Sequence, residues 1–360
     1  MTRQIKHAGI ATSRGKEHVR RVTVDDVPRA TVLFVHGNCS SSAFWDSVLL
    51  ALPDDVAGVA VDLRGYGDSE PRPIDATRGV QDFADDLEAL AGHLAPALDG
   101  GPLLAVAHSA GAAVVLQAAT DHPDLFAGIL LEAPMSPYGF GGTHGPDGAP
   151  NAPDFAGSGG GTANPDFVAA IAAGDRSDGP GSPRDVLRRF YVADPASLGD
   201  DEEALLDSVL STRTGDDFYP GDTTSSDTWP FLAPGTRGMN NAISPKFCDV
   251  SGFARSGATA PVLWVHGAVD AIVSDTSALD LAQLGAVGVV PGWPGADAAP
   301  PQPMVGQTRA VLDLYAAAGG SYREVELAGV GHSPHLEARE EFLSLLVGLV
   351  DEVADPKEDR

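Results

Sequence analysis

Apolar runs and helical repeats alternate along the first third of this chain. Residues 30–35 are apolar almost throughout, and residues 57–62 and 103–107 repeat that pattern. Such runs predict parallel strands that are buried on both faces. Residues 80–98 instead place apolar side chains every three or four positions, which predicts an amphipathic helix whose last turn frays or ends at Pro96. The alternation predicts a parallel sheet covered by helices on both faces.

The remaining regular elements follow from the same rules. Strands are expected at residues 17–24, 126–131, 261–265 and 322–327, and helices at 43–52, 110–121, 305–318 and 337–353. The polar start, Met1 to Arg14, has no apolar segment of the kind that a signal peptide needs. No later apolar run reaches membrane-spanning length without an interruption by charge, Gly or Pro.

The composition and the pattern of the sequence change after about Ala133. Residues 134–259 are dense in Gly, Pro, Asn and Asp and contain only short helical patterns, and regular alternation resumes at Ala260. We therefore predict a core domain of residues 1–133 and 260–360, with a largely helical, loop-rich cap inserted at residues 134–259. A second Pro- and Gly-rich stretch, residues 285–303, is expected to fold over the site and narrow its entrance.

A serine stands at the junction of one buried strand and the following helix. Residues 103–107 run into His108 and Ser109, and small residues open the next helix. This order predicts a nucleophile elbow, in which a sharp turn lifts the serine hydroxyl out of the sheet. The positions two before and two after the serine must be small, and they are Ala107 and Gly111. The motif alone is weak, so partners elsewhere in the chain must support it.

An acid and a base follow later strands in the order that this chemistry needs. Asp270 comes a few residues after the strand at 261–265, and His332 follows the strand at 322–327. We predict that Ser109, Asp270 and His332 form a catalytic triad. The plain alternatives for Asp270 are a solvated loop aspartate or a helix N-cap. His335 is the local competitor of His332, but it stands at a helix start, from which it would point away.

The oxyanion of a serine reaction needs two backbone donors. One is expected from the N–H of Ala110, directly after the nucleophile. The other is expected from the loop His36-Gly37-Asn38-Cys39, through the N–H of Asn38 or of Cys39. For His36 and Gly37 the plain alternative is an ordinary strand-to-helix turn. Cys39 itself is not expected to be the nucleophile, because Ser109 has the better context.

Aromatic residues supply candidates for a substrate pocket. Those of the predicted cap, together with two residues of the core domain, are expected to line an apolar acyl or alcohol pocket: Trp45, His108, Tyr138, Phe140, Trp229 and Phe231. The alternative is that the cap aromatics only attach the cap to the sheet.

Composition narrows the classes of partner. The 360 residues carry 23 basic and 50 acidic side chains, a net charge of −27. Such a surface repels phosphates and anionic lipid heads, so nucleic acid and membrane are not expected partners. The acidity is typical of a salt-adapted or of a GC-rich source. The sequence is compatible with a homodimer but does not specify one.

Cysteine and histidine usage bears on compartment and cofactors. The two cysteines, Cys39 and Cys248, are too few for a disulfide framework, which favours a reducing, cytoplasmic location. The ten histidines are scattered, without paired spacing that would suggest a metal site.

Four motifs stand in order along the chain: His36-Gly37-Asn38, the loop from Asp62 to Ser69, His108-Ser109-Ala110-Gly111, and the late pair Asp270 and Gly331-His332. Together they resemble the α/β-hydrolase superfamily, in its serine esterase-like branch with a cap, over residues 17 to 353. The resemblance implies an eight-stranded, mostly parallel sheet flanked by helices and no cofactor. Ala107 departs from the glycine that is usual before the elbow.

The resemblance also limits the chemistry. Related dehalogenases and epoxide hydrolases use an aspartate nucleophile, whereas position 109 is Ser, and the elbow sequence differs from those of proline iminopeptidases and C–C bond hydrolases. The expected function is hydrolysis of a carboxylic ester or lactone of a small apolar or aromatic molecule through an acyl-enzyme. The alternatives are C–C, amide or peroxide chemistry at the same triad, or a non-catalytic ligand receptor.

Overall fold

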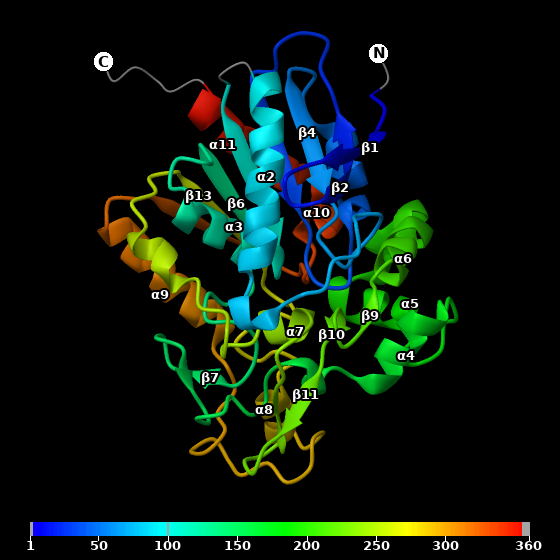
Figure 1. The fold of residues 1–360 in the computed structure, drawn as a ribbon, viewed down its shortest axis with the longest axis vertical. Helices are drawn as coiled ribbons and strands as arrows, with labels where there is room; N and C mark the ends of the chain where they lie inside the picture. The colour runs from blue at the N-terminus through cyan, green and yellow to red at the C-terminus, as the bar shows by residue number, and fades with distance from the viewer. Residues whose placement is uncertain (1–2, 99–100, 355–360) are drawn as a thin grey trace.

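The computed structural model describes residues 3–98 and 101–354 of the chain. A single large sheet of eight strands forms its centre, in the order β1-β2-β4-β3-β5-β6-β13-β14 (Figure 1). The strands β4, β3, β5, β6, β13 and β14 pair in parallel, and β2 runs antiparallel to both of its neighbours, β1 and β4. The strands are β1 (Lys6–Ala11), β2 (Lys16–Val22), β3 (Ala30–Val35), β4 (Val56–Val61), β5 (Leu103–His108), β6 (Gly128–Glu132), β13 (Val262–Gly267) and β14 (Tyr322–Leu327). The predicted eight-stranded, mostly parallel sheet is confirmed.

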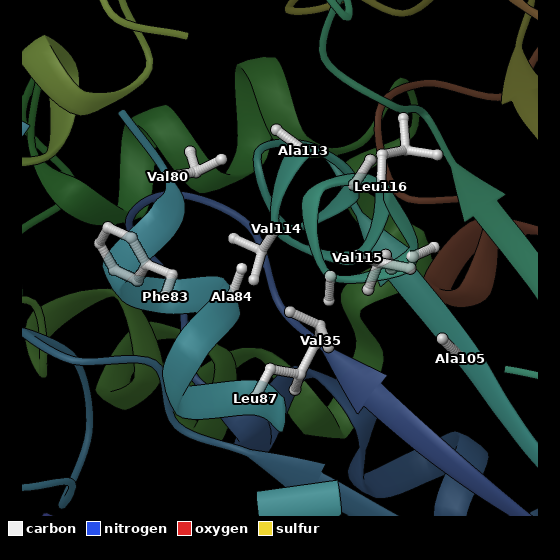
Figure 2. Close-up of a cluster of buried hydrophobic side chains, with 14 of the residues drawn as sticks. Val35, Val80, Phe83, Ala84, Leu87, Ala105, Ala113, Val114, Val115 and Leu116 are labelled. Atoms are coloured by element: carbon white, nitrogen blue, oxygen red, sulfur yellow. The ribbon is translucent and has the colours of Figure 1, made fainter. Parts of the chain in front are cut away.

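Helices cover both faces of the sheet. On one face, α2 (Gln81–Leu98), α3 (Gly111–Asp121) and α9 (Met304–Ala317) pack with alternate side chains of the strands (Figure 2). On the other face lie α1 (Asp46–Ala51) and α11 (Arg339–Ala354). In β3, Leu33 belongs to the first cluster and Phe34 to the second. A continuous apolar run is therefore what a doubly covered strand requires.

Two details of the elements differ from the sequence expectation. Strand β1 is not expected from the sequence, because it lies at the exposed edge and buries only Ile10, so its residues form no continuous apolar run. Helix α2 continues past Pro96 to Leu98. Pro96 lacks only its own N–H donor, so the two residues after it can still bond to the preceding turn.

The chain between β6 and β13 contributes no strand to the large sheet. It forms short helices and two-stranded pairs, which lie beside and below the sheet in the view of Figure 1. Its helices are α4 (Pro165–Ala173), α5 (Pro183–Val186), a π-helical turn (Leu187–Tyr191), α6 (Glu202–Leu210) and α7 (Met239–Ala242), with 3₁₀ turns at Gly160–Thr162, Pro195–Asp201 and Ser251–Arg255. Its strands are β7 (Thr143–His144), β8 (Ala149–Pro150), β9 (Thr214–Gly215), β10 (Tyr219–Pro220), β11 (Thr223–Ser225) and β12 (Leu232–Pro234). Residues 134–259 are called the insertion below.

The insertion packs on loops at the carboxyl ends of the strands. Its buried side chains, among them Leu187 and Tyr191, form one apolar cluster with Phe44 and with Leu336 of the short helix α10 (Pro334–Glu337). This places the insertion over the edge of the sheet where parallel α/β folds gather their functional groups.

The Pro- and Gly-rich segment 285–303, which follows α8 (Leu281–Ala286), also packs on the insertion. The indole N–H of Trp229 donates to Pro291 O at 3.0 Å, and the N–H of Gly141 donates to Gln302 Oε1 at 2.6 Å. In the described residues, every helix is too short or too polar to cross a membrane.

Candidate active site

Ser109 occupies a strained turn between β5 and α3. Its φ angle is +54°, in the left-handed region that non-glycine residues rarely adopt. The Ser109 N–H donates to Glu132 O at 2.9 Å, and the N–H of Met135 donates to Ser109 O at 3.1 Å. Two bonds, one to the last residue of β6 and one to the chain after it, therefore hold the turn in this conformation.

Small residues let the elbow lie close to the strand beside it. A Cβ on Gly111 would contact the backbone oxygen of His36 and would lie 2.9 Å from Val35 O. Gly37 lies against the serine itself, since a Cβ on Gly37 would be 2.8 Å from the Ser109 Cβ. The glycines at 37 and 111 are thus required by space, and they bring the loop after β3 against Ser109.

His332 and Asp270 form a buried hydrogen-bonded pair. The distance from His332 Nδ1 to Asp270 Oδ2 is 2.8 Å, and the residues are 2% and 5% exposed. The other oxygen of Asp270 accepts from the N–H groups of Ile272 and Val273 at 2.7 and 2.9 Å. Because the carboxylate fixes a proton on Nδ1, Nε2 of His332 is left as an acceptor.

His108 joins the elbow to the histidine loop. Its Nε2 donates to His332 O at 2.8 Å, and the two rings lie with centroids 4.6 Å apart. Burial, followed by the neighbouring charges of His332 and His335, lowers the pKa of His108 well below its usual value. His108 is therefore a neutral spacer that holds the loop of His332 beside Ser109.

His335, the competing base, is occupied elsewhere. Its Nδ1 lies 2.9 Å from Glu132 Oε1, and its Nε2 donates to Phe44 O at 3.1 Å. Both residues are fully buried. With both ring nitrogens bonded, His335 has none left for Ser109.

The loop after β3 contains the two candidate oxyanion donors, the N–H groups of Asn38 and Cys39, and only one of them lacks an acceptor in the described part of the chain. The N–H of Cys39 donates to the Asn38 side-chain oxygen at 3.0 Å, so it is already used. Among the described residues, the N–H groups of Asn38 and Ala110 have no acceptor. Of the two candidates in this loop, the geometry favours Asn38.

His36 fixes the orientation of that loop. It accepts the Leu63 N–H at Nε2 (3.0 Å), so Nδ1 carries the proton and donates to Gly37 O at 2.7 Å. Burial lowers the pKa of His36 to about 4, against the smaller opposing effect of the Asp62 charge. The C=O and N–H of a peptide group point in opposite directions. Holding Gly37 O therefore aims the Asn38 N–H away from His36.

The cysteines do not compete as nucleophiles. Both are buried, and burial raises the pKa of Cys39 and of Cys248 to about 12. A thiol is a nucleophile only as thiolate, so both remain inert at ordinary pH. In the described part of the chain, no group of three or more His, Cys, Asp or Glu side chains could hold a metal ion.

The pocket candidates of the core domain and the early insertion are distributed over two places. Trp45 is buried and meets the ring of His108 edge to face, with centroids 6.4 Å apart. Tyr138 and Phe140 are half-buried against the cluster on the α2–α3 face.

The two later candidates lie at the far end of the insertion. Trp229 packs with Ala282 and Ala299, and Phe231 is 61% exposed. Within the described residues, the contacts of Tyr138, Phe140, Trp229 and Phe231 do not include the three candidate catalytic side chains. Their assignment to a pocket stays a prediction.

Two residues that contact the site were not expected from the sequence. Tyr191 lies with its ring 6.1 Å from that of His332, and Asn240 accepts a hydrogen bond from Asn38 Nδ2 at 2.9 Å. Tyr191 and Asn240 stand 153 and 202 residues after Asn38, with which both form hydrogen bonds, in a part of the sequence with no motif. No local signal could have identified them.

Comparison with known proteins bears on the family and the fold of this chain. Residues 32–345 match the sequence model described as the alpha/beta hydrolase family. A probable lysophospholipase of Arabidopsis thaliana, BODYGUARD 4, is 34% identical over 114 residues, which is 31% of this chain and 26% of that protein. A 2-(acetamidomethylene)succinate hydrolase of Mesorhizobium japonicum is 35% identical over 107 residues, 30% of this chain and 36% of that protein. The matched stretches thus span about a quarter to a third of these relatives.

The solved structures extend the likeness to the whole fold. A putative aryl esterase from Burkholderia cenocepacia superimposes with a TM-score of 0.59 at 18% identity, over 97% of this chain and 99% of that one. At this identity the likeness concerns the fold alone. The family match covers most of the chain, and on that ground this protein belongs to the alpha/beta hydrolase family.

Proposed function

We propose that this protein is a serine hydrolase that cleaves a carboxylic ester or lactone of a small apolar or aromatic molecule. One observation carries the proposal: the strained Ser109 directly follows His108, whose ring hydrogen-bonds to His332 O, and Asp270 holds Nδ1 of His332 at 2.8 Å. Nucleophile, base and orienting acid are the three parts of a serine triad.

The proposed mechanism uses these groups in turn. His332 Nε2 takes the proton of the Ser109 hydroxyl as its oxygen attacks the ester carbonyl. Asp270 keeps the imidazole in the required tautomer and stabilises the imidazolium that forms. The N–H groups of Asn38 and Ala110 bind the oxyanion. The alcohol leaves with the proton from His332, and water then releases the acid from the acyl-enzyme in the same way.

The insertion is proposed to act as a cap over this site. Ser109 is 8% exposed, and the insertion packs through Leu187 and Tyr191 on Phe44, beside the catalytic loops. A covered site excludes water and favours an apolar substrate. The matched relatives are named as a probable lysophospholipase and a 2-(acetamidomethylene)succinate hydrolase, and the structural neighbours include esterases, which supports hydrolysis as the reaction class.

The test is the effect of Ser109→Ala on turnover of p-nitrophenyl esters of increasing acyl length. We expect the wild-type protein to hydrolyse short or aromatic esters and the variant to lose at least about 10³-fold in kcat. Ser158→Ala, which removes a buried hydroxyl of the insertion, is the matched control and should keep its activity. Undiminished turnover by Ser109→Ala would refute the nucleophile. A wild-type protein that turns over C–C, amide or peroxide substrates but no ester would refute the ester class.

A further inference from the structure

The loop that carries the proposed oxyanion donor contains a second strained residue. Cys39 has a φ of +48°, in the left-handed region, directly after Asn38. Such a conformation is unfavourable for a residue other than glycine and persists only where surrounding contacts hold it. The contacts that hold this loop therefore determine where the Asn38 N–H points.

Contacts from the core domain fix one side of the loop. His36 and Ser40 both donate to Gly37 O, at 2.7 and 3.0 Å. The phenol O–H of Tyr66 donates to Asn38 Oδ1 at 2.6 Å.

Contacts from the insertion fix the other side. The phenol O–H of Tyr191 lies 3.0 Å from both Asn38 O and Cys39 O, so it bridges the carbonyls on either side of the strained residue. Asn240 accepts from the side chain of Asn38 at 2.9 Å. Tyr191 is 6% exposed, so little water is available to replace its hydroxyl if that is removed.

The same segment of the insertion also reaches the loop of the catalytic histidine. Glu337 accepts the N–H of Gly331 at 2.6 Å through one oxygen, and the N–H groups of Ala193 and Asp194 at 2.7 and 3.1 Å through the other. The chain from Tyr191 to Asp194 is thus bonded to the Asn38 loop directly and to the His332 loop through one carboxylate.

We propose that Tyr191 is a positioning residue for the oxyanion hole, which the insertion completes when it is seated on the sheet. This inference rests on the proposed function. Tyr191 does not touch the substrate in this account. Its hydroxyl holds the peptides on either side of Cys39, and through them the direction of the Asn38 N–H. Since a displacement of about 1 Å in a catalytic group can cost on the order of 10²-fold in rate, loss of this tether should lower kcat.

The test compares two tyrosine hydroxyls that both donate to a backbone carbonyl. Tyr191→Phe removes the tether and keeps the ring that packs on Phe44. Tyr315→Phe is the matched control. The Tyr315 hydroxyl, on α9, donates to Ala260 O at 2.7 Å, and the Tyr315 ring stacks on Phe253 in the core. Each variant of the full chain is assayed for kcat and KM on a p-nitrophenyl ester, for inhibition by an alkylboronic acid, and for its melting temperature.

We expect Tyr191→Phe to lower kcat roughly 10- to 100-fold with KM changed less than about three-fold. The boronic acid becomes tetrahedral when the Ser109 oxygen bonds to boron, and one boronate oxygen then occupies the oxyanion hole, so its affinity should fall by a similar factor. Tyr315→Phe should lose comparable thermal stability and keep kcat within about two-fold. A Tyr191→Phe protein that loses stability like the control but retains kcat and boronate affinity would overturn the inference.

Asn240→Ala provides a second measurement if Tyr191→Phe fails to fold. It removes the other hydrogen bond between the insertion and Asn38, so kcat and boronate affinity should both fall. If kcat and boronate affinity were unchanged, the inference would be overturned. Failure of the proposed function looks different. A wild-type protein without ester turnover or boronate binding would refute both, whereas an active wild type with an inactive Ser109→Ala variant leaves only the role of Tyr191 at stake.

Discussion

The carboxylate of Asp270 has both oxygens committed, one to His332 and the other to two backbone N–H groups. An asparagine in its place would present either an oxygen or an NH₂ group to His332 Nδ1. The backbone N–H groups demand the oxygen, so the NH₂ would face the imidazole and select the wrong tautomer.

Asp270→Asn should therefore lower kcat by roughly 10³- to 10⁴-fold without loss of fold. Steady-state kinetics with circular dichroism as the control for folding measures this. A variant with kcat near that of the wild type would show that Asp270 does not orient the base.

Gly37 tests the space around the nucleophile. A Cβ there would lie 2.8 Å from Ser109 Cβ and 3.2 Å from His108 O. Gly37→Ala should thus shift the elbow or the loop and lower kcat by at least about 10²-fold. Crystallography of the variant, or its rate of labelling by a fluorophosphonate, would measure the effect. Labelling at the wild-type rate would contradict the stated packing.

The three residues of the candidate triad could be predicted from the sequence because each of them follows a strand. The residues that hold it could not. Tyr191 lies in the insertion, 153 residues from Asn38, and Glu132 pairs with His335 across 203 residues. Their spacing carries no period, so only the folded chain shows the contacts.

The elements themselves were predictable where burial is strong. Strands β3 and β5 are buried on both faces and read as continuous apolar runs, whereas the edge strand β1 buries one side chain and was missed. The insertion shows the expected short helices, but its two- and three-residue strands leave too little pattern to detect.

Two helical glycines offer a test of element stability. Gly92 in α2 and Gly348 in α11 are exposed, and an added Cβ at either would meet nothing within 4 Å. Replacement by alanine should stabilise the protein by about 0.5–1 kcal/mol each, because glycine loses more backbone entropy in a helix. Urea denaturation would measure the gain. A loss of stability in either variant would contradict the helix assignment at that position.

Asp62 links the pH dependence of the whole molecule to one buried group. Burial alone would raise its pKa, but hydrogen bonds from His18 and from the N–H groups of Ser42 and Asp68 lower the pKa to about 2. The folded state therefore prefers the ionised carboxylate. Its contribution is fully present above the ordinary pKa of 3.8 and is lost as pH falls through about 2.

The depressed pKa is worth about 2 kcal/mol. The difference in unfolding free energy between wild type and Asp62→Asn should shrink by about this amount as pH falls from 5 to 2. Denaturant titrations at a series of pH values would show it. A difference that is constant over this range would contradict the ionised, hydrogen-bonded state.

The net charge of −27 governs the response of the whole molecule to salt. Internal ion pairs, such as Arg64 with Asp86 at 2.7 Å, are buried and weakly screened, whereas the excess of acidic groups repels itself across the surface. The melting temperature should therefore rise as NaCl increases from about 10 mM, where screening is weak, to about 0.5 M. A falling melting temperature would mean that exposed ion pairs dominate.

The proposed function depends on one atom, the side-chain oxygen of Ser109. Incubation of the wild-type protein with a fluorophosphonate, followed by peptide mass spectrometry, tests it most directly. We expect one adduct per chain, on the peptide that contains Ser109, with ester turnover lost in proportion to labelling. An adduct on another residue, or full loss of turnover without modification of Ser109, would contradict it.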